Sequence, residues 1–276
     1  MSDLRAFYIN LASRADRREH LERELERSGI RAERVEAVTV DDVERLMRSG
    51  ELPSEALQIL TPGEIACSLS HRLAWTKALE AGARAAMIFE DDAVIAPAVA
   101  SIGCETLDLL RADVLKLDKA NDSGARLGSR RYETGAGVCF RMLYNRQVGC
   151  AGYVATERAM KDFLQTDFQV REPVDRFMFG YDLIRRRTFQ AVPALVAQLG
   201  RAPGRGDAEA ARSDLVTERR AKQDYRGAAR RLPPLHKRLW SNWPTIREIA
   251  LRDPLALFRP AQPLPLAEFP DKDASD

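Results

Sequence analysis

The chain has 276 residues, 43 of them basic and 41 acidic, and the resulting formal net charge of +2 argues against a dedicated nucleic-acid clamp. Hydrophobic residues make up 45% of the sequence, which permits a substantial buried core and excludes a largely disordered chain. The length predicts one large domain or two small ones, and no apolar run approaches the roughly 18 to 20 residues of a membrane span.

The N-terminus shows no charged leader and no cleavage site, so we expect a cytoplasmic protein, at most peripheral on the inner face of the membrane. The four cysteines, Cys67, Cys104, Cys139 and Cys150, lie far apart and form no CxxC pair. This spacing favours reduced core thiols over a disulfide framework or a zinc site. We therefore expect none of the four to carry chemistry.

The first part of the chain alternates between strand and helix patterns. Residues 4–11 predict the first strand, and Ser13 is placed to cap a helix that ends at Gly29. A second strand is predicted at residues 34–38, followed by a charged helix at residues 42–48. This order of strand, turn and helix is typical of the opening of an α/β unit.

The motif Thr61-Pro62-Gly63-Glu64 combines a threonine N-cap, a proline at the first helical position and a glutamate that can reach back to the cap. It predicts a helix that runs to Gly82, with apolar residues at helical spacing. The next apolar run, residues 85–89, has the length of a strand and is bounded by Gly82 and three carboxylates. It predicts a central buried strand.

Further strands are predicted at residues 113–117, 135–141 and 147–155, and Thr156 is placed to cap a short helix. Residues 189–197 predict another strand, and Pro193 within it indicates an edge strand, because proline donates no ladder hydrogen bond.

The composition changes after Gly200, where Gly, Ala, Arg and Asp dominate. We expect residues 1–200 to form one domain and residues 201–276 to form a polar linker and a basic, aromatic C-terminal tail.

The tail carries Lys237, Arg238 and Arg247 among Trp240 and Trp243. This pattern is compatible with peripheral contact to a membrane surface. Packing of the two aromatic side chains against the main domain is an equal alternative.

Three carboxylates, Glu90, Asp91 and Asp92, directly follow the predicted central strand. Ligands of open α/β sheets bind beyond the carboxyl ends of the strands, which makes this position favourable for a site. Adjacent carboxylates repel one another, so a cation or a helix N-terminus must compensate them. Their hard oxygen atoms suit Mg²⁺ or Mn²⁺. The alternative is a solvated acidic turn.

Three arginines, Arg14, Arg17 and Arg18, follow the first predicted strand. With the backbone donors of a helix N-terminus they could hold a phosphate or a uracil-ribose unit. They could equally solvate a helix whose glutamates balance their charge.

Two other residues could carry chemistry. His71 has no GxSxG motif and no second histidine nearby, so a packed or capping histidine is the ordinary interpretation. Asp175 opens a predicted helix and could be a metal ligand, a sugar-hydroxyl acceptor, a base, or only a first-turn aspartate. P-loop and dinucleotide chemistry are disfavoured because their glycine signatures are missing.

Seven segments, taken in order, resemble glycosyltransferase family 25, the lipooligosaccharide galactosyltransferase group that also includes collagen galactosyltransferase domains. The resemblance covers most of the first two hundred residues. The segments are Tyr8-Ile9-Asn10-Leu11 with Arg14, Arg17 and Arg18; Gly63-Glu64-Ile65-Ala66-Cys67 through Ser70-His71 and Trp75; Phe89-Glu90-Asp91-Asp92; Asp113-Val114-Leu115-Lys116-Leu117; Gly149-Cys150-Ala151-Gly152-Tyr153; Pro173-Val174-Asp175; and Pro193 with Gln198.

The resemblance implies a GT-A-like fold, with a Rossmann-related mixed sheet flanked by helices. It also implies a UDP-sugar donor, usually UDP-galactose, a cation that is Mn²⁺ or Mg²⁺, and inversion at the anomeric carbon. The acceptor would be a hydroxyl of a glycan or glycolipid, in the biosynthesis of lipopolysaccharide, lipooligosaccharide or another surface polysaccharide.

The same resemblance assigns expected roles to residues. Asp91 and Asp92 would bind the metal, and Asp175 would be the base, with His71 as second candidate. The nucleotide-sugar pocket would contain Asn10, Leu11, Arg14, Arg17, Arg18, Glu64, Ser70 and Glu90.

Two other functions compete with sugar transfer. One is a metal-dependent phosphohydrolase, although the first strand ends in Ile9-Asn10-Leu11 without a carboxylate nucleophile. The other is a non-catalytic module that binds anionic glycolipid through its arginines, for which Asp91 and Asp92 would be dispensable.

Overall fold

The computed structural model describes residues 3–53, 56–119, 124–134, 137–165, 172–180, 186–202, 247, 250–257 and 259–270. The strands are β1 (Leu4–Asn10), β2 (Ala32–Glu36), β3 (Ala85–Glu90), β4 (Ala93–Ile95), β5 (Val114–Lys116), β6 (Asp118–Lys119), β7 (Tyr132–Glu133), β8 (Cys139–Met142), β9 (Gly152–Thr156), β10 (Thr188–Val192) and β11 (Val196–Gln198). The helices are α1 (Ala15–Arg27), α2 (Val40–Ser49), α3 (Ala56–Ile59), α4 (Pro62–Glu80), α5 (Cys104–Leu110), α6 (Glu157–Gln165) and α7 (Val174–Phe179), with short 3₁₀ turns at Pro97–Ser101, Leu199–Arg201 and Pro254–Leu257.

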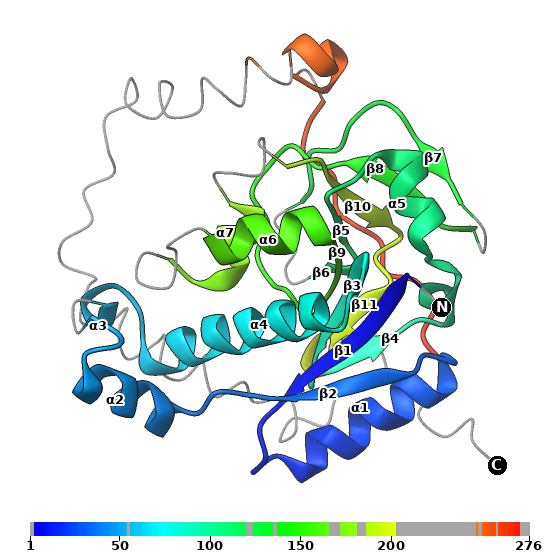
Figure 1. Ribbon diagram of the computed structural model, residues 1–276. Helices are drawn as coiled ribbons and strands as arrows, with labels where there is room; N and C mark the ends of the chain where they lie inside the picture. The colour runs from blue at the N-terminus through cyan, green and yellow to red at the C-terminus, as the bar shows by residue number, and fades with distance from the viewer. Residues whose placement is uncertain are drawn as a thin grey trace.

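Within the described residues, the strands form two sheets. The large sheet has eight strands in the order β2-β1-β3-β9-β5-β10-β8-β7, and the small sheet has three in the order β4-β11-β6. Parallel and antiparallel pairs both occur in the large sheet, and helices cover it (Figure 1). The predicted α/β class with a mixed sheet flanked by helices is confirmed.

Helices α4 and α1 show how local sequence sets an element's start. Thr61 and Glu64 form the predicted capping box of α4, with Pro62 in its first turn. The predicted Ser13 cap of α1 is wrong: the helix begins one residue later, Arg14 is at its N-cap, and no side chain caps it. Residues 11–14 first form a turn, in which the Arg14 N–H donates a hydrogen bond to the Leu11 carbonyl oxygen. This turn shifts the start of the helix by one residue toward the C-terminus.

The edge strand predicted at residues 189–197 is also wrong. This segment forms two strands, β10 and β11, which belong to different sheets. Strand β10 lies inside the large sheet between β5 and β8 and ends at Val192. Pro193 therefore follows the strand and interrupts no ladder, so the proline marks the crossing between the sheets.

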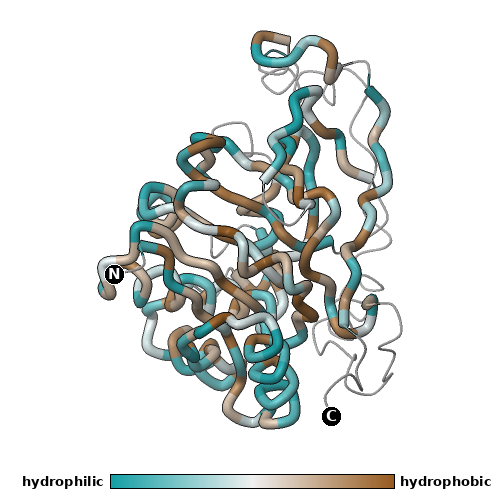
Figure 2. The backbone as a smooth tube through the Cα atoms, turned by 90° about the vertical axis from the view of Figure 1, so that its right-hand side faces the viewer, coloured by the Kyte–Doolittle hydropathy of each residue, from teal (hydrophilic) through white to brown (hydrophobic). Residues whose placement is uncertain are grey.

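The two faces of the large sheet bury separate apolar clusters. One cluster, which includes Trp75 and Phe163, lies under α4, α6 and α7, and the other, which includes Leu21, lies under α1 and α5. Strand β3 contributes to both in alternation, with Ile88 in the first cluster and Phe89 in the second. Figure 2 shows hydrophobic residues concentrated in the central strands and hydrophilic ones along the outer helices.

Strand direction determines which residues meet. Strands β1, β2 and β3 are mutually parallel, so their carboxyl ends share one edge of the sheet. Strand β9 is antiparallel to both β3 and β5. The segment that precedes Gly152 and the carboxyl end of β5 therefore reach the same edge, which places Asn10, Glu90 and Lys116 there.

Part of the predicted tail packs on the domain. Ala125 and Gln262 exchange backbone hydrogen bonds of 2.7 and 2.9 Å. Ala256 and Leu264 are buried. The described C-terminal residues therefore contribute to the fold, and the domain boundary after residue 200 stays a prediction.

Most residues of the predicted membrane-contact pattern lie outside the described part of the chain. Lys237, Arg238, Trp240 and Trp243 lie outside the described residues, and Arg247 is exposed. Among the described residues, no helix combines the length and the apolarity needed to cross a bilayer.

Candidate functional site

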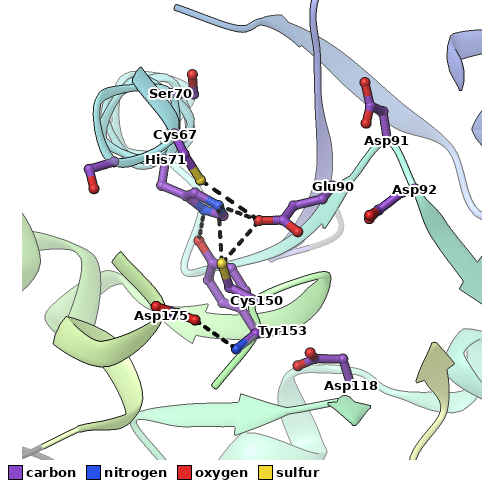
Figure 3. Close-up of polar contacts among 12 residues, drawn as sticks. Cys67, Ser70, His71, Glu90, Asp91, Asp92, Asp118, Cys150, Tyr153 and Asp175 are labelled. Carbon is purple, nitrogen blue, oxygen red and sulfur yellow. Dashed lines mark hydrogen bonds and ion pairs between the residues drawn. The ribbon is translucent and has the colours of Figure 1, made fainter. Parts of the chain in front are cut away.

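The three consecutive carboxylates diverge at the end of β3 (Figure 3). Because side chains alternate along a strand, Glu90 lies on the Ile88 side of the sheet, toward α4, and Asp91 lies on the Phe89 side, toward α1. Figure 3 shows Asp92 directed toward Glu90 and Asp91 directed away from both. The three neighbouring carboxylates therefore lie in three different environments.

Asp91 belongs to a buried polar network with the first strand and helix. Its Oδ2 accepts a hydrogen bond from Asn10 Nδ2 at 2.9 Å, and its Oδ1 contacts Arg17 NH1 at 3.2 Å. Arg34, which was given no role from sequence, donates to Asn10 Oδ1 at 3.2 Å. Burial raises the pKa of Asp91, opposed by Arg17 and Asn10. Each Asp91 oxygen has one such contact and keeps a lone pair, and the predicted metal-binding role of Asp91 stays a prediction.

Glu90 faces α4 and gathers three donors on a single oxygen. Its Oε1 lies 3.0 Å from Cys150 Sγ, 3.3 Å from His71 Nε2 and 4.0 Å from Cys67 Sγ. Cys67 and His71 are four residues apart on α4 and so share one helix face. All four cysteines are free, as expected, and the expectation that none of them carries chemistry stays a prediction.

A buried hydrogen-bond chain fixes the orientation of His71. Its Nδ1 lies 2.9 Å from Tyr153 Oη, and that oxygen accepts a bond from Trp75 Nε1 at 2.8 Å. His71 is 1% exposed. Packing around Tyr153 and Trp75 therefore directs Nε2 of the ring at Glu90 and Cys150.

The cluster shifts the titration of its members. Burial lowers the pKa of His71, but hydrogen bonds and charge from Cys67 and Glu90 outweigh it and raise the pKa to about 9. The hydrogen bond with Cys150 is the main reason that the pKa of Cys67 falls to about 7. Burial acts to raise the pKa of Glu90, but the hydrogen bond and charge of His71 outweigh it and hold the pKa of Glu90 below the ordinary value. The cluster thus combines an imidazolium with a carboxylate.

Asp92 carries a buried oxygen without a partner. Its Oδ1 is inaccessible to solvent and has no hydrogen-bond partner among the described residues, while Oδ2 accepts a long bond of 3.4 Å from Gln198 Nε2. The residue as a whole is half-buried. Burial, and then the charge of Glu90, raise the pKa of Asp92 to about 8. A polar atom left unpaired in this way is costly unless a ligand completes it.

Asp118 and Lys116 form a second buried pair, to which sequence reasoning gave no role. Lys116 Nζ lies 2.5 Å from Asp118 Oδ1 and 2.6 Å from the Gly149 carbonyl oxygen. The other Asp118 oxygen, Oδ2, is buried and has no partner in the part of the chain that the structure describes, and burial raises the pKa of this carboxyl. Their position at the carboxyl end of the predicted 113–117 strand was the signal that could have indicated them.

Asp175 lies beside the Cys150 segment. Its Oδ2 accepts the Gly149 N–H at 3.0 Å and its Oδ1 accepts the Arg176 N–H at 2.8 Å. The first turn of α7 therefore holds Asp175 against the segment that precedes β9. Each carboxylate oxygen retains a lone pair in this arrangement.

Other predicted pocket residues have structural partners outside this group. Glu64 completes the capping box of α4, and Ser70 Oγ bridges the Ala66 carbonyl and the Val38 N–H. The remaining three are Leu11, which accepts from Arg14 N; Arg14, which pairs with Asp16; and Arg18, which lies 4.0 Å from Glu22. The structure brings together Asn10, Arg17 and Asp91, and separately His71 and Glu90. The nucleotide-sugar role of all these residues stays a prediction.

Raising the pH should destabilise the metal-free protein through Asp92. Its pKa is about 8 in the folded chain against an ordinary 3.8, so the folded state binds this proton more tightly than the unfolded state does. The free energy of unfolding therefore falls as pH rises through this window. We expect the gain in Tm of Asp92→Asn over wild type to be larger at pH of about 8.5 than at about 5.5. Equal gains at both values contradict the prediction.

Comparison with known proteins gives a family match and several relatives. The model of glycosyltransferase family 25 (LPS biosynthesis protein) matches residues 4–178. A Neisseria gonorrhoeae protein, the lacto-N-neotetraose biosynthesis glycosyltransferase LgtB, is 30% identical over 69% of this chain and 72% of its own length. The lipooligosaccharide biosynthesis protein lic2B of Haemophilus influenzae is 24% identical over 70% of this chain and 76% of its own.

Another Haemophilus influenzae protein is 31% identical over 58% of this chain, and the match spans just over half, 56%, of that relative. Among solved structures, a glycosyltransferase involved in glycosylation of the major capsid of PBCV-1 has a TM-score of 0.43 at 10% identity, over 75% of this chain and 96% of its own.

Proposed function

Because the chain belongs to glycosyltransferase family 25, we propose that it transfers a hexose such as galactose from a UDP-sugar to a hydroxyl of a glycan or glycolipid, with inversion at the anomeric carbon. The family description and the relatives LgtB and lic2B support a role in lipopolysaccharide or lipooligosaccharide biosynthesis.

The observation that carries the proposal is the unpartnered, buried Oδ1 of Asp92 at the carboxyl edge of the sheet. Mg²⁺ and Mn²⁺ commonly take one or two protein carboxylates and complete their shell with water and substrate phosphates. Asp92 would hold such a cation, and the negative charges of Glu90 and Asp118, which raise the pKa of Asp92, would favour it. The residues present therefore fit Mn²⁺ or Mg²⁺.

The charges at this edge suit a nucleotide diphosphate leaving group. When bound, the cation supplies positive charge that stabilises the diphosphate more strongly as the sugar–oxygen bond breaks. Asn10 and Arg17, held in place by Asp91, would orient the nucleotide beyond β1. Lys116, paired with Asp118, lies buried at the carboxyl end of β5 on the same edge of the sheet.

Inversion requires the acceptor hydroxyl to attack the face of the sugar opposite the leaving group, and a base to remove its proton. Asp175 is our candidate for this base because its carboxylate is fixed by two backbone N–H groups and keeps lone pairs. His71 is less suited, since both of its ring nitrogens face buried partners.

A phosphohydrolase would use the same acidic edge to activate water. Strand β1 ends in Asn10, however, so no carboxylate stands at the end of this strand to act as the nucleophile. Release of phosphate or sugar from a UDP-sugar without an acceptor would favour this alternative over transfer.

Thermal denaturation with a panel of nucleotide sugars, with and without Mn²⁺, tests the proposal. We expect one UDP-sugar to raise Tm only when the metal is present. At a ligand concentration of about 100 times Kd, binding should raise the free energy of unfolding by about 2.7 kcal/mol. UDP should then appear only when acceptor is added. The absence of any metal-dependent shift across the panel would count against the proposal, and activity that survives both Asp91→Asn and Asp92→Asn would favour the binding-module alternative.

A further inference from the structure

We propose that Cys67, His71, Glu90 and Cys150 form a binding site for a thiophilic divalent cation of the zinc class. The ligand atoms of Cys67, His71 and Glu90 all lie within 4.8 Å of one another. Cys150 Sγ joins them, 3.5 Å from His71 Nε2 and 3.0 Å from Glu90 Oε1 (Figure 3). This soft site is different from the hard-cation position at Asp92.

Four of the six separations between these atoms are close to those of a tetrahedral centre. With Zn–S of about 2.3 Å and Zn–N or Zn–O of about 2.0–2.2 Å, neighbouring ligand atoms of different types lie roughly 3.4–3.6 Å apart. The observed separations are 3.3 Å for oxygen to nitrogen, 3.5 Å for nitrogen to the Cys150 sulfur, and 3.0 and 4.0 Å for oxygen to the two sulfurs. Small side-chain shifts would equalise them.

A helix and a strand hold three of the four ligands, and a hydrogen-bonded segment holds the fourth. Cys67 and His71 lie one turn apart on α4, and Glu90 ends the buried strand β3. Cys150 is in the segment before β9, where Asp175 fixes the preceding Gly149 N–H. Sites on such supported elements need little rearrangement to bind an ion.

The surroundings of His71 are those of a metal ligand. Ligating histidines nearly always engage their second ring nitrogen with another group, which fixes the ring. Here Nδ1 lies 2.9 Å from Tyr153 Oη, whose two lone pairs can accept from both Trp75 Nε1 and His71 Nδ1. The lone pair of Nε2 is then directed at Glu90 and Cys150.

Electrostatics favour a cation over the metal-free arrangement. Without an ion, two thiols and the imidazole all converge on the single oxygen Oε1 of Glu90. A divalent cation would replace these competing donors by deprotonated ligands. Two thiolates and one carboxylate exceed the charge of a divalent cation by one, and Lys116, which is paired with Asp118, also acts electrostatically on Glu90. Thiolate and imidazole ligands select zinc over Mn²⁺.

Metal analysis of the full-length protein, purified with a reductant and without chelators, tests the site. We expect about one equivalent of zinc per chain. Replacement by Co²⁺ should give a thiolate-to-cobalt charge-transfer band and the visible bands of a tetrahedral ion. Cys67→Ser and Cys150→Ser should each weaken Co²⁺ binding more than about tenfold. The matched variants Cys104→Ser and Cys139→Ser, whose thiols lie elsewhere, should bind as wild type does.

Alkylation of the wild-type protein gives a readout that no folding defect can mimic. Bound zinc should protect Cys67, the less buried of the two thiols, as read by peptide mass spectrometry, and a chelator should expose it to the reagent. The proposal fails if zinc and Co²⁺ leave labelling unchanged and produce no charge-transfer band. Neither measurement uses a sugar donor, so this result is independent of the proposed transfer reaction.

Discussion

Replacing Asp92 by asparagine is expected to lower kcat for sugar transfer by about 100-fold or more, because stabilisation of the leaving group by a cation is worth several kcal/mol. The amide keeps the size of the side chain but loses the charge that would hold the metal. The Mn²⁺-dependent rise in Tm with the nucleotide sugar should disappear with it. Steady-state kinetics and thermal denaturation of the same preparation provide both measurements.

Asp108→Asn is the matched control for this variant. Asp108 lies exposed on α5, where it pairs with Arg84, so the same change should alter stability by less than about 0.5 kcal/mol and leave the kinetics unchanged. The metal-free Asp92→Asn protein should also be more stable than wild type at high pH, which separates lost chemistry from unfolding. If Asp92→Asn retains the wild-type kcat and the wild-type response to metal, Asp92 does not bind the cation.

Asp175→Asn should reduce kcat by about 10²- to 10⁴-fold while donor binding persists, because loss of a positioned base costs that much. The amide oxygen can still accept the bond from Gly149, so the segment before β9 keeps one anchor. Donor binding measured by thermal denaturation on the same preparation provides a second readout and should match that of wild type.

Glu157→Gln is a suitable comparison, since Glu157 lies in the first turn of α6, is half exposed and pairs only on the surface with Lys161. It should leave kcat unchanged. If instead Asp175→Asn keeps its activity within about tenfold and His71→Gln loses it, the base is His71. A fall in donor affinity with unchanged kcat would assign Asp175 to positioning of the Gly149 segment.

Several features of the fold could be predicted from single residues. The capping box at Thr61 and Glu64 fixes the start of α4 because cap and helix are neighbours in sequence. The strand β3 follows from an unbroken apolar run before three carboxylates. Pro193 misled the prediction because a break in a strand pattern does not reveal that the chain passes into another sheet.

The candidate site was only partly predictable. The acidic triplet pointed to the carboxyl edge of the sheet, where the described polar clusters lie, but not to the different partners of Glu90, Asp91 and Asp92. Cys67 and Cys150 are 83 positions apart in sequence, so spacing rules for short motifs could not relate them. The one-turn spacing of Cys67 and His71 on a predicted helix was the available signal.

The sequence by itself determined the start of α4, the buried strand β3 and the acidic end of that strand, because these depend on contacts between near neighbours. Only the tertiary structure decided which carboxylate is paired and which keeps an open oxygen. That outcome depends on α1, α4 and the antiparallel strand β9 reaching the same edge of the sheet, where Arg17, His71 and Cys150 meet the triplet from different directions. Such convergence is a property of strand order and direction, which no local pattern encodes.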